Sequence, residues 1–364
     1  KIVKDAKDLH DAKDAYKRKD YKTAYKLFLP LVEQGIPQAQ FFFGVMFEEG
    51  KGVLQDENKG IKWHRLAAEQ GNIASQFILG GKYFFGQGVP QDYKEALKWY
   101  RLAVEQGDAT AQFWLGSIHA EGKGVPKNNK EAVRLYRLSA EQGFAKAQFL
   151  LGGMYFKGEV VPQDNQEAIK WWKLAAEQGV SGAQSNLGSM YIKGRGVQKD
   201  YKRAIKWYRL AAEQGHAVAQ IVMGGIYHEG KGVQKDSKEA EKWWKLAAAQ
   251  GNVWAQNILG TMYTLGQGVP KNGREGEKWW RLAAEQGHER SQVFLANMYQ
   301  QGQGVPINYK EAAKWYRRAA NQGNASAQFF LAGMYYEGHG VPQNYDEAIK
   351  WYRLAANQGD ILAK

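Results

Sequence analysis

Glycine recurs every 36 residues through most of this chain of 364 residues. Nine intervals separate Gly35 from Gly359 without an insertion or deletion, and a glutamine keeps the same spacing from Gln40 to Gln328. A fixed period of this length is typical of stacked structural repeats. The sequence therefore predicts one continuous array of repeats, although the length alone would suggest two or three separate domains. The glycines of this series are Gly35, Gly71, Gly107, Gly143, Gly179, Gly215, Gly251, Gly287, Gly323 and Gly359.

Each 36-residue unit has the pattern of two helices joined by a glycine-rich turn. Leu115 and Ile118 mark the apolar side of a first helix, and Ala96 and Trp99 mark that of a second helix. The second helix ends before a glycine such as Gly107, which suits a left-handed C-terminal cap. Neither helix can bury its apolar side alone. We therefore expect an all-α solenoid in which helix-turn-helix repeats stack on one another.

Residues that occupy equivalent positions in successive repeats form columns, and two further columns concern packing. A glycine in the middle of the first helix costs ~1 kcal/mol relative to alanine, so its recurrence predicts that a neighbouring backbone passes too close for a side chain. A tryptophan column on the second helix is interpreted as the core between repeats. The glycine column contains Gly44, Gly80, Gly116, Gly152, Gly188, Gly224 and Gly260; the tryptophan column contains Trp63, Trp99, Trp171, Trp207, Trp243, Trp279, Trp315 and Trp351, with Leu135 in one unit.

Composition limits the class of protein. Hydrophobic residues form 44% of the chain and aromatic residues 13%, which is too much for a disordered protein. No run approaches the ~20 apolar residues that a membrane-spanning helix needs. The chain has no cysteine, which excludes disulfide bonds and thiolate metal sites.

The net charge of +13 raises the question of an anionic partner. Two columns of the second helix, which begin at Lys62 and Arg65, supply 18 of the 50 basic residues. Glutamates precede the first column by three residues, as Glu95 precedes Lys98, and follow the second by four, as Glu69 follows Arg65. Pairs at these spacings lie on a helix surface. We therefore favour a solvated face over an anion-binding ladder, and we expect no nucleic-acid partner.

Residues suited to catalysis or metal binding are not arranged in a recognisable motif. The seven histidines have no His-x-x-x-His spacing, and the Gly-x-Ser-x-Gly and Ser-x-x-Lys motifs of nucleophilic catalysis are absent. The sequence thus predicts no catalytic residues, no metal site and no cofactor. We expect a protein that is not an enzyme.

The columns together give the pattern Ala-Gln-x-x-Leu-Gly-x-Met-Tyr-x-x-Gly-x-Gly-Val-x-x-Asp-Tyr-x-x-Ala-x-x-Trp-Tyr-x-x-Ala-Ala-x-x-Gly. This pattern resembles the Sel1-like repeat (SLR) family, whose members are relatives of the tetratricopeptide repeats. The resemblance covers residues 36–359 as nine repeats. Residues 1–35 look like a tetratricopeptide-like capping helix pair, and residues 360–364 look like the start of a further, truncated repeat.

The resemblance implies a right-handed α/α superhelix whose first helices line the concave side, together with an adaptor or scaffold role. Bacterial members are commonly secreted or periplasmic and take part in host interaction, virulence or envelope assembly. By this resemblance we expect a monomeric, exported bacterial protein. Some cysteine-rich bacterial relatives have been described as binding or hydrolysing β-lactams. Because this chain has no cysteine, a β-lactam hydrolase is only a remote alternative.

The concave side implied by the resemblance is where we expect a protein or peptide partner. If Ala39 lies at the centre of the packed side, then positions 41, 45 and 48 of the first helix lie opposite it. Position 45 is mostly small, whereas positions 41 and 48 are often aromatic, and Trp254 lies at the rim. The predicted partner-binding residues are Phe41, Phe77, Phe84, Phe113, Phe149, Phe156, His228, Trp254, Phe329 and Tyr336.

Two alternatives to this groove stay open. The aromatic side chains could instead close gaps between neighbouring first helices. They could also serve as stacking platforms for a carbohydrate or envelope polymer, which would make the protein a polymer-binding module rather than an adaptor.

Overall fold

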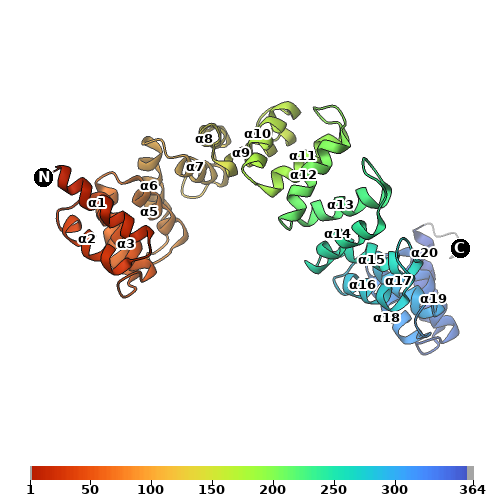
Figure 1. Cartoon of the computed structure of the whole chain (residues 1–364). Coiled ribbons are helices and arrows are strands. Elements are labelled where there is room, and N and C mark those ends of the chain that lie inside the picture. The colour runs from red at the N-terminus through yellow and green to blue at the C-terminus, as the bar shows by residue number, and fades with distance from the viewer. Residues whose placement is uncertain (1, 359–364) are drawn as a thin grey trace. The chain divides into compact units, whose positions relative to one another are not determined.

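The computed structural model describes residues 2–358, and in that range it contains twenty helices and no strand (Figure 1). The chain divides into two compact units, Lys1–Val180 and Ser181–Lys364, and each is described by itself. The first unit contains α1 (Ile2–Lys17), α2 (Tyr21–Glu33), α3 (Pro37–Glu49), α4 (Glu57–Glu69), α5 (Ile73–Phe85), α6 (Tyr93–Glu105), α7 (Ala109–Glu121), α8 (Asn129–Glu141), α9 (Ala145–Lys157) and α10 (Asn165–Glu177). The second contains α11 (Ser181–Lys193), α12 (Tyr201–Glu213), α13 (Ala217–Glu229), α14 (Ser237–Ala249), α15 (Val253–Leu265), α16 (Gly273–Glu285), α17 (Glu289–Gln301), α18 (Tyr309–Asn321), α19 (Ala325–Glu337) and α20 (Tyr345–Asn357).

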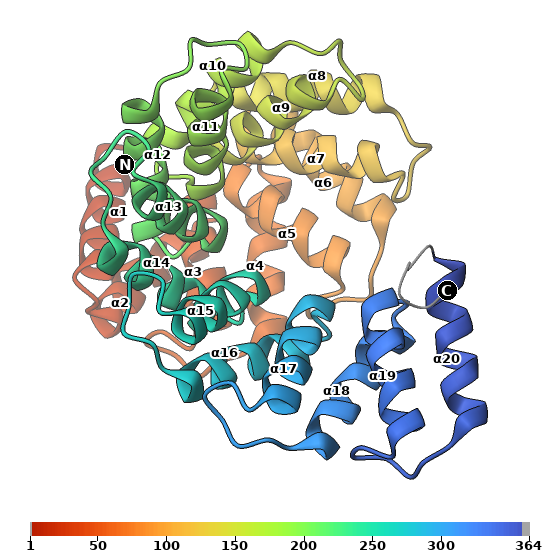
Figure 2. The ribbon, with the colours of Figure 1, turned by 90° about the vertical axis from the view of Figure 1, so that its right-hand side faces the viewer.

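Consecutive helices form pairs, and within each unit every helix packs against its neighbours in the chain. In the second unit, α15, α17 and α19 lie in one row and α16, α18 and α20 in the next (Figure 2). The predicted all-α class, built from 36-residue helix pairs, is confirmed. The 36-residue period continues unchanged through Val180, where the two units meet in the sequence. The sequence therefore gives no indication of a boundary between two units. Residues 359–364, including the predicted start of a further repeat, lie outside the described residues.

The alternation of helices gives each unit two faces. The first-helix face carries the odd-numbered helices from α3 onward, and the second-helix face carries the even-numbered helices from α4 onward. Capping fixes where these helices begin and end. Asp92, for example, accepts hydrogen bonds from the backbone nitrogens of Lys94 and Glu95 at 2.8 and 3.1 Å at the start of α6. Gly86 ends α5 with φ of 70°, a conformation that other residues rarely adopt.

The glycine in the middle of seven first helices, from Gly44 to Gly260, touches an aromatic ring; α17 and α19 have alanine at this position, Ala296 and Ala332. A Cβ added to Gly224 would lie 2.4 Å from Nε1 of Trp244, and one added to Gly80 would lie 2.8 Å from the ring of Tyr100. The expectation that a backbone makes the close approach is therefore wrong. The neighbour is a side chain of the second helix in the same repeat, and the missing Cβ lets that ring lie flat against the first helix.

The tryptophan column of the second helix lies between repeats, as predicted. Trp99 on α6 is buried in a cluster with Ile61 and Ala68 of the preceding repeat and Leu79 of its own. Trp243 on α14 likewise packs among residues of α12 and α13. These rings bury large apolar surfaces at the junction of adjacent repeats, which is the interaction that a single helix pair cannot provide.

The glutamine column links three successive helices through its amides. Gln76 on α5 donates to the carbonyl oxygen of Ala68 on α4 at 3.1 Å and accepts from Nε2 of Gln106, just after α6, at 2.8 Å. The same two bonds recur in the second unit, where Gln220 donates to Ala212 and accepts from Gln250. Where both bonds form, the buried amide has one partner in its own repeat and one in the repeat before, which fixes the register of stacking.

Replacing Gly224 by alanine should destabilise the protein by about 1–3 kcal/mol, because the new methyl group would overlap the Trp244 ring. Gly225 is the matched control: a Cβ there has no atom within 4 Å. Gly225→Ala should therefore raise stability by up to ~1 kcal/mol through helix preference alone. Urea unfolding followed by circular dichroism measures both changes, and equal effects would contradict the packing role of the ring.

Candidate functional site

The ten predicted partner-binding residues differ in exposure. Trp254 is 61% exposed and Tyr336 is 57% exposed, whereas Phe84 is buried. The other residues, which are Phe41, Phe77, Phe113, Phe149, Phe156, His228 and Phe329, are half-buried.

Position 41 of the repeat packs on the second helix of its own repeat. The ring of Phe77 lies 5.8 Å from that of Tyr100, and the ring of Phe329 lies 5.4 Å from that of Tyr352. Position 48 makes the same kind of contact, since His228 lies 5.5 Å from Trp244. One side of these rings therefore fills space inside the repeat, and only the other side is available to a partner.

Four aromatic side chains on the first-helix face of the first unit form a continuous cluster. Phe85, the last residue of α5, is 51% exposed and lies edge-to-face with Trp114 of α7 at 5.8 Å. Trp114 also contacts Phe84 at 6.4 Å and Phe113 at 5.8 Å. We call Phe84, Phe85, Phe113 and Trp114 the aromatic cluster. It combines an exposed ring with three rings that hold it in place.

Sequence reasoning missed two members of this cluster, Phe85 and Trp114. A signal for Phe85 was present, because the equivalent position carries Glu121, Lys157 and Glu229 in other repeats. The column is otherwise charged or polar except for Leu265, so a phenylalanine in it places an aromatic ring at an exposed position. Trp114 gave no such signal, since its column is apolar in most repeats.

Exposed aromatic residues in the second unit are more scattered. Trp254 lies edge-to-face with His288 at 5.1 Å, and Val218 holds the same position one repeat earlier at 56% exposure. Tyr336 contacts Tyr345 at 5.5 Å near the end of the described chain. These two contacts are pairs.

A larger group of rings in the second unit includes Phe330 of α19, which is 36% exposed. Its ring lies 5.4 Å from Tyr316 and 5.6 Å from Phe329, and Phe329 also contacts Tyr352.

The two basic columns behave differently from one another. The first makes the predicted pairs three residues back: Lys242 lies 3.0 Å from Glu239 and Lys350 lies 3.2 Å from Glu347. These pairs are exposed to solvent, as expected for a solvated face.

The second basic column mostly does not pair with the glutamate four residues later. Arg137 and Arg209 instead donate to the hydroxyl groups of Tyr155 and Tyr227 in the next repeat, each at 2.6 Å. Arg65, Arg281 and Arg317 make the same bond to Tyr83, Tyr299 and Tyr335. Among the described residues only Lys173 and Glu177 make the predicted pair, at 4.0 Å. The prediction is otherwise wrong, because the tyrosine of the next repeat competes for the cation.

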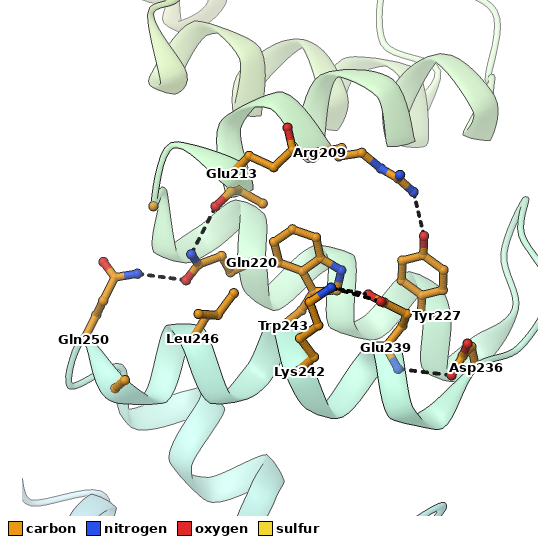
Figure 3. Close-up of a pocket in the computed structure, with 13 residues that line it drawn as sticks. Arg209, Glu213, Gln220, Tyr227, Asp236, Glu239, Lys242, Trp243, Leu246 and Gln250 are labelled. Carbon is orange, nitrogen blue, oxygen red and sulfur yellow. Dashed lines mark hydrogen bonds and ion pairs between the residues drawn. The ribbon is translucent and has the colours of Figure 1, made fainter.

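An open cleft of about 880 Å³ lies between α12 and α14 on the second-helix face (Figure 3). Trp243, Gln220, Glu213, Leu246 and Gln250 are among the residues that line it. An equivalent cleft of about 470 Å³ lies between α4 and α6 in the first unit. Leu246, three residues after Trp243 and so on the same side of α14, is 45% exposed.

A buried polar cluster interrupts the apolar core between α3, α4 and α5. Lys82 lies 3.0 Å from Glu48, and Nε2 of His64 lies 3.6 Å from the other oxygen of the same carboxylate. Lys82 stands where other repeats have methionine or isoleucine, as at Met46. Burial raises the pKa of Glu48, but the adjacent His64 and Lys82 outweigh this effect and hold the pKa below its ordinary value.

The described residues contain no group of three or more His, Cys, Asp or Glu side chains placed to hold a metal ion. None of the described helices has both the length and the apolar character needed to cross a membrane.

The repeat itself identifies the family. The family model described as Sel1 repeat matches residues 37–72, 73–108, 109–144, 145–180, 181–216, 217–252, 255–288, 290–324 and 325–360. The chain belongs to the Sel1-repeat family. Sel1 repeats form a scaffold that typically mediates protein–protein interaction.

Solved Sel1-repeat structures agree with this assignment. The chain is 37% identical to c5321, described as a protective antigen present in uropathogenic Escherichia coli strains, with a TM-score of 0.79 over 94% of this chain and 73% of that one. It is 32% identical to a Sel1 repeat protein from Oxalobacter formigenes, with a TM-score of 0.67 over 83% of this chain and 88% of that one. A comparison with curated proteins finds no match.

Changing Glu48 to glutamine should lower the stability of this Sel1-repeat chain by about 1–3 kcal/mol at neutral pH, because Lys82 loses its buried partner. A depressed carboxyl pKa stabilises the fold above the ordinary value of 4.5 and ceases to do so as the pH falls through the folded pKa. The gap between parent and variant should therefore shrink below pH 4.5.

Thermal unfolding between pH 3 and pH 7 measures this gap in stability. The range spans the pH values at which a glutamate carboxyl group titrates. Glu49→Gln is the control, since Glu49 is exposed and pairs with Lys51 at the surface. Its effect should stay within ~0.5 kcal/mol. A Glu48→Gln gap that is constant with pH would show that the ionised carboxylate does not stabilise the fold.

Proposed function

We propose that this protein is a non-enzymatic scaffold that binds a protein or peptide on the first-helix face, the side that the family resemblance places in the concave groove. The observation that carries the proposal is the aromatic cluster, in which Phe85 is half exposed and braced by Trp114. The typical role of Sel1 repeats in protein–protein interaction supports it.

The cluster has the properties of a binding hot spot. Hot spots are enriched in large aromatic residues that offer much apolar area and lose little conformational freedom on binding. Phe85 is held between Phe84 at 4.9 Å and Trp114 at 5.8 Å, so part of its ordering cost is already met in the free protein. Phe113 extends the surface toward α9 through its contact with Phe144 at 5.3 Å.

The other predicted groove residues have a supporting role in this proposal. Phe41, Phe77 and Phe329 contact the second helix on one side and expose part of the other. Trp254 and Tyr336 offer two further exposed rings in the second unit. Small residues at position 45, such as Gly81 and Gly153, leave room for the partner between them.

We further propose that the protein is exported by a bacterium and acts in host interaction or envelope assembly. Two bacterial relatives support this, one of which is described as a protective antigen. Secretion or a periplasmic location, and a monomeric state, are part of the same proposal.

Changing Phe85 and Trp114 together to alanine should weaken partner binding by several kcal/mol, on the order of the loss of two hot-spot residues. Affinity capture with the immobilised chain, from bacterial envelope extract and from host serum in parallel, identifies the partner, and titration calorimetry then measures its affinity. Leu54→Ala is the control, because Leu54 is 90% exposed in the loop after α3 and lies outside the cluster.

Equal capture by the parent and by the Phe85/Trp114 variant would place the binding surface elsewhere. Retention of a glycan or envelope polymer, with no protein partner, would favour the polymer-binding alternative. Because Trp114 is half-buried, its replacement could affect the fold, so circular dichroism is used to check that the variant is folded.

A further inference from the structure

The repeat at residues 181–216 carries more positive charge than any other repeat of the chain. It contains seven basic and two acidic residues, and so holds +5 of the net charge of +13. The repeats before and after it in the sequence, residues 145–180 and 217–252, have net charges of 0 and +1. The basic residues of the repeat are Lys193, Arg195, Lys199, Lys202, Arg203, Lys206 and Arg209.

Much of this excess arises in the first turn of α12. The other eight second helices of the Sel1 repeats have an acidic residue in that turn, whereas α12 has none. Arg203 stands where seven other repeats have glutamate, as at Glu239. Lys206 therefore lacks the partner that Lys242 has on α14. Among the described residues, neither Lys202 nor Lys206 forms an ion pair.

Four of these cations form one exposed surface, which we call the basic patch: Lys199, Lys202, Arg203 and Lys206. Lys202 and Arg203 precede Lys206 by one helical turn, so the three share one side of α12. Lys199 lies in the turn that leads into the helix. Like charges at these spacings repel one another, so packing and helix stability do not account for the patch.

A pocket of about 290 Å³ lies at the start of α12 and joins the basic patch, since Lys199 and Arg203 both line it. Its one carboxylate, that of Asp200, is already engaged. It accepts a hydrogen bond from the backbone nitrogen of Arg203 at 2.9 Å and lies 3.3 Å from Nε of the same residue. Two cations and one carboxylate leave the pocket with a single positive charge. The other lining residues are Tyr191, Val197 and Gln198.

Aromatic rings lie beneath the two cations of the pocket. The Arg203 guanidinium lies 5.8 Å from the centre of the Tyr191 ring, and Nζ of Lys199 lies 5.0 Å from that of Tyr201. Both rings are half-buried, and both cations are exposed. These contacts restrict the cations without neutralising them, so their charge stays available to a ligand.

The adjoining turn of the next repeat does not cancel this charge. It packs against the start of α12, where a Cβ added to Gly232 would lie 2.6 Å from Cβ of Tyr201. The nearest acidic residue of that turn, Glu229, pairs with Lys231 beside it. The basic patch therefore stays positive within the second unit.

We propose that the basic patch binds an acidic segment of a protein partner. One carboxylate of that segment lies in the pocket between Lys199 and Arg203, and another lies about one helical turn, ~6 Å, further along α12 beside Lys206. The patch is on the second-helix face and the aromatic cluster is on the first-helix face, so this inference stands or falls independently of the proposed binding at the cluster.

The extent and the charge of the patch favour a peptide over a nucleic acid or a membrane. Those partners spread their negative charge over a long surface and are bound by basic areas that extend in the same way. The basic patch ends within one repeat, because Glu239 restores the acidic position on α14. The single positive charge of the pocket matches one carboxylate better than a doubly charged phosphate.

Fluorescence anisotropy with the full chain and fluorescein-labelled peptides of ~12 residues tests the proposal. The peptides have the same sequence except that their variable positions carry glutamate, glutamine or lysine. The glutamate peptide should bind at least ~tenfold more tightly than the glutamine peptide, and added salt should weaken its binding. Equal binding of the glutamate and glutamine peptides would overturn the proposal.

The variant for this test is Lys199→Gln with Arg203→Glu, which introduces the residues found at Gln163 and Glu167 one repeat earlier. Because the same fold already accepts both residues at these positions, the variant should remain folded and at least as stable as the parent, which circular dichroism and thermal unfolding check. It should bind the glutamate peptide ~tenfold more weakly, since the pocket loses both of its cations.

The matched control is Lys271→Gln with Arg274→Glu at the start of α16, where both residues are exposed. It changes the net charge of the chain by the same amount and should keep the affinity for the glutamate peptide within ~twofold. A similar loss of binding in both variants would reduce the effect to overall charge and refute the site.

Two further probes represent the other anionic partners: a labelled single-stranded DNA of ~12 nucleotides, and vesicles of phosphatidylglycerol and phosphatidylcholine in equal parts. Neither should bind as tightly as the glutamate peptide. If either binds the parent more tightly than that peptide does and loses affinity in the Lys199→Gln/Arg203→Glu variant, the patch serves that partner and the proposal is wrong.

Discussion

In seven of the nine repeats, a glycine of the first helix contacts an aromatic ring of the second helix, and this contact sets the distance between the two helices; the other two repeats have Ala296 and Ala332 at this position. At Gly224 and Gly80 the ring lies where a Cβ would otherwise be. Beside this contact, the glutamine of the first helix bonds both its own repeat and the one before. The tryptophan column then fills the remaining junction. Both faces of the molecule, and every candidate site on them, take their geometry from this packing.

Function is best sought where a repeat departs from its own rules. Phe85 places an aromatic ring in a column of mostly charged residues, and Lys82 places a cation in a column of methionine and isoleucine. The second is explained by the carboxylates of Glu48 and Glu57, which lie 3.0 and 3.4 Å from the Lys82 ammonium. The first is half exposed and extends the aromatic cluster to the surface rather than filling the core. A repeat protein offers many internal controls for such a judgement, because every position has several equivalents in the same chain.

The sequence predicted the helix pairs and the tryptophan core, since both follow from spacing and from caps that act over a few residues. Predictions from the sequence were wrong where the hydrogen-bond partner of a side chain lies in the next repeat. Arg209 has a glutamate four residues later, yet it bonds Tyr227, and nothing in the sequence ranks these two partners. The exposure of Leu246 was missed for a similar reason, because periodicity places it on the apolar side and only the packed structure shows that the cleft beside it is open.

The glutamine pairs have a consequence for how such a chain can change in length. Each buried amide takes one bond from its own repeat and gives one to the repeat before, and the next repeat does the same. A whole 36-residue repeat can therefore be gained or lost by duplication or deletion while the amides on either side of the change meet equivalent partners in the adjoining repeat. An insertion within one of the bonded helices would instead move the glutamine away from its partners, whereas an insertion in a turn between helices would leave these bonds intact.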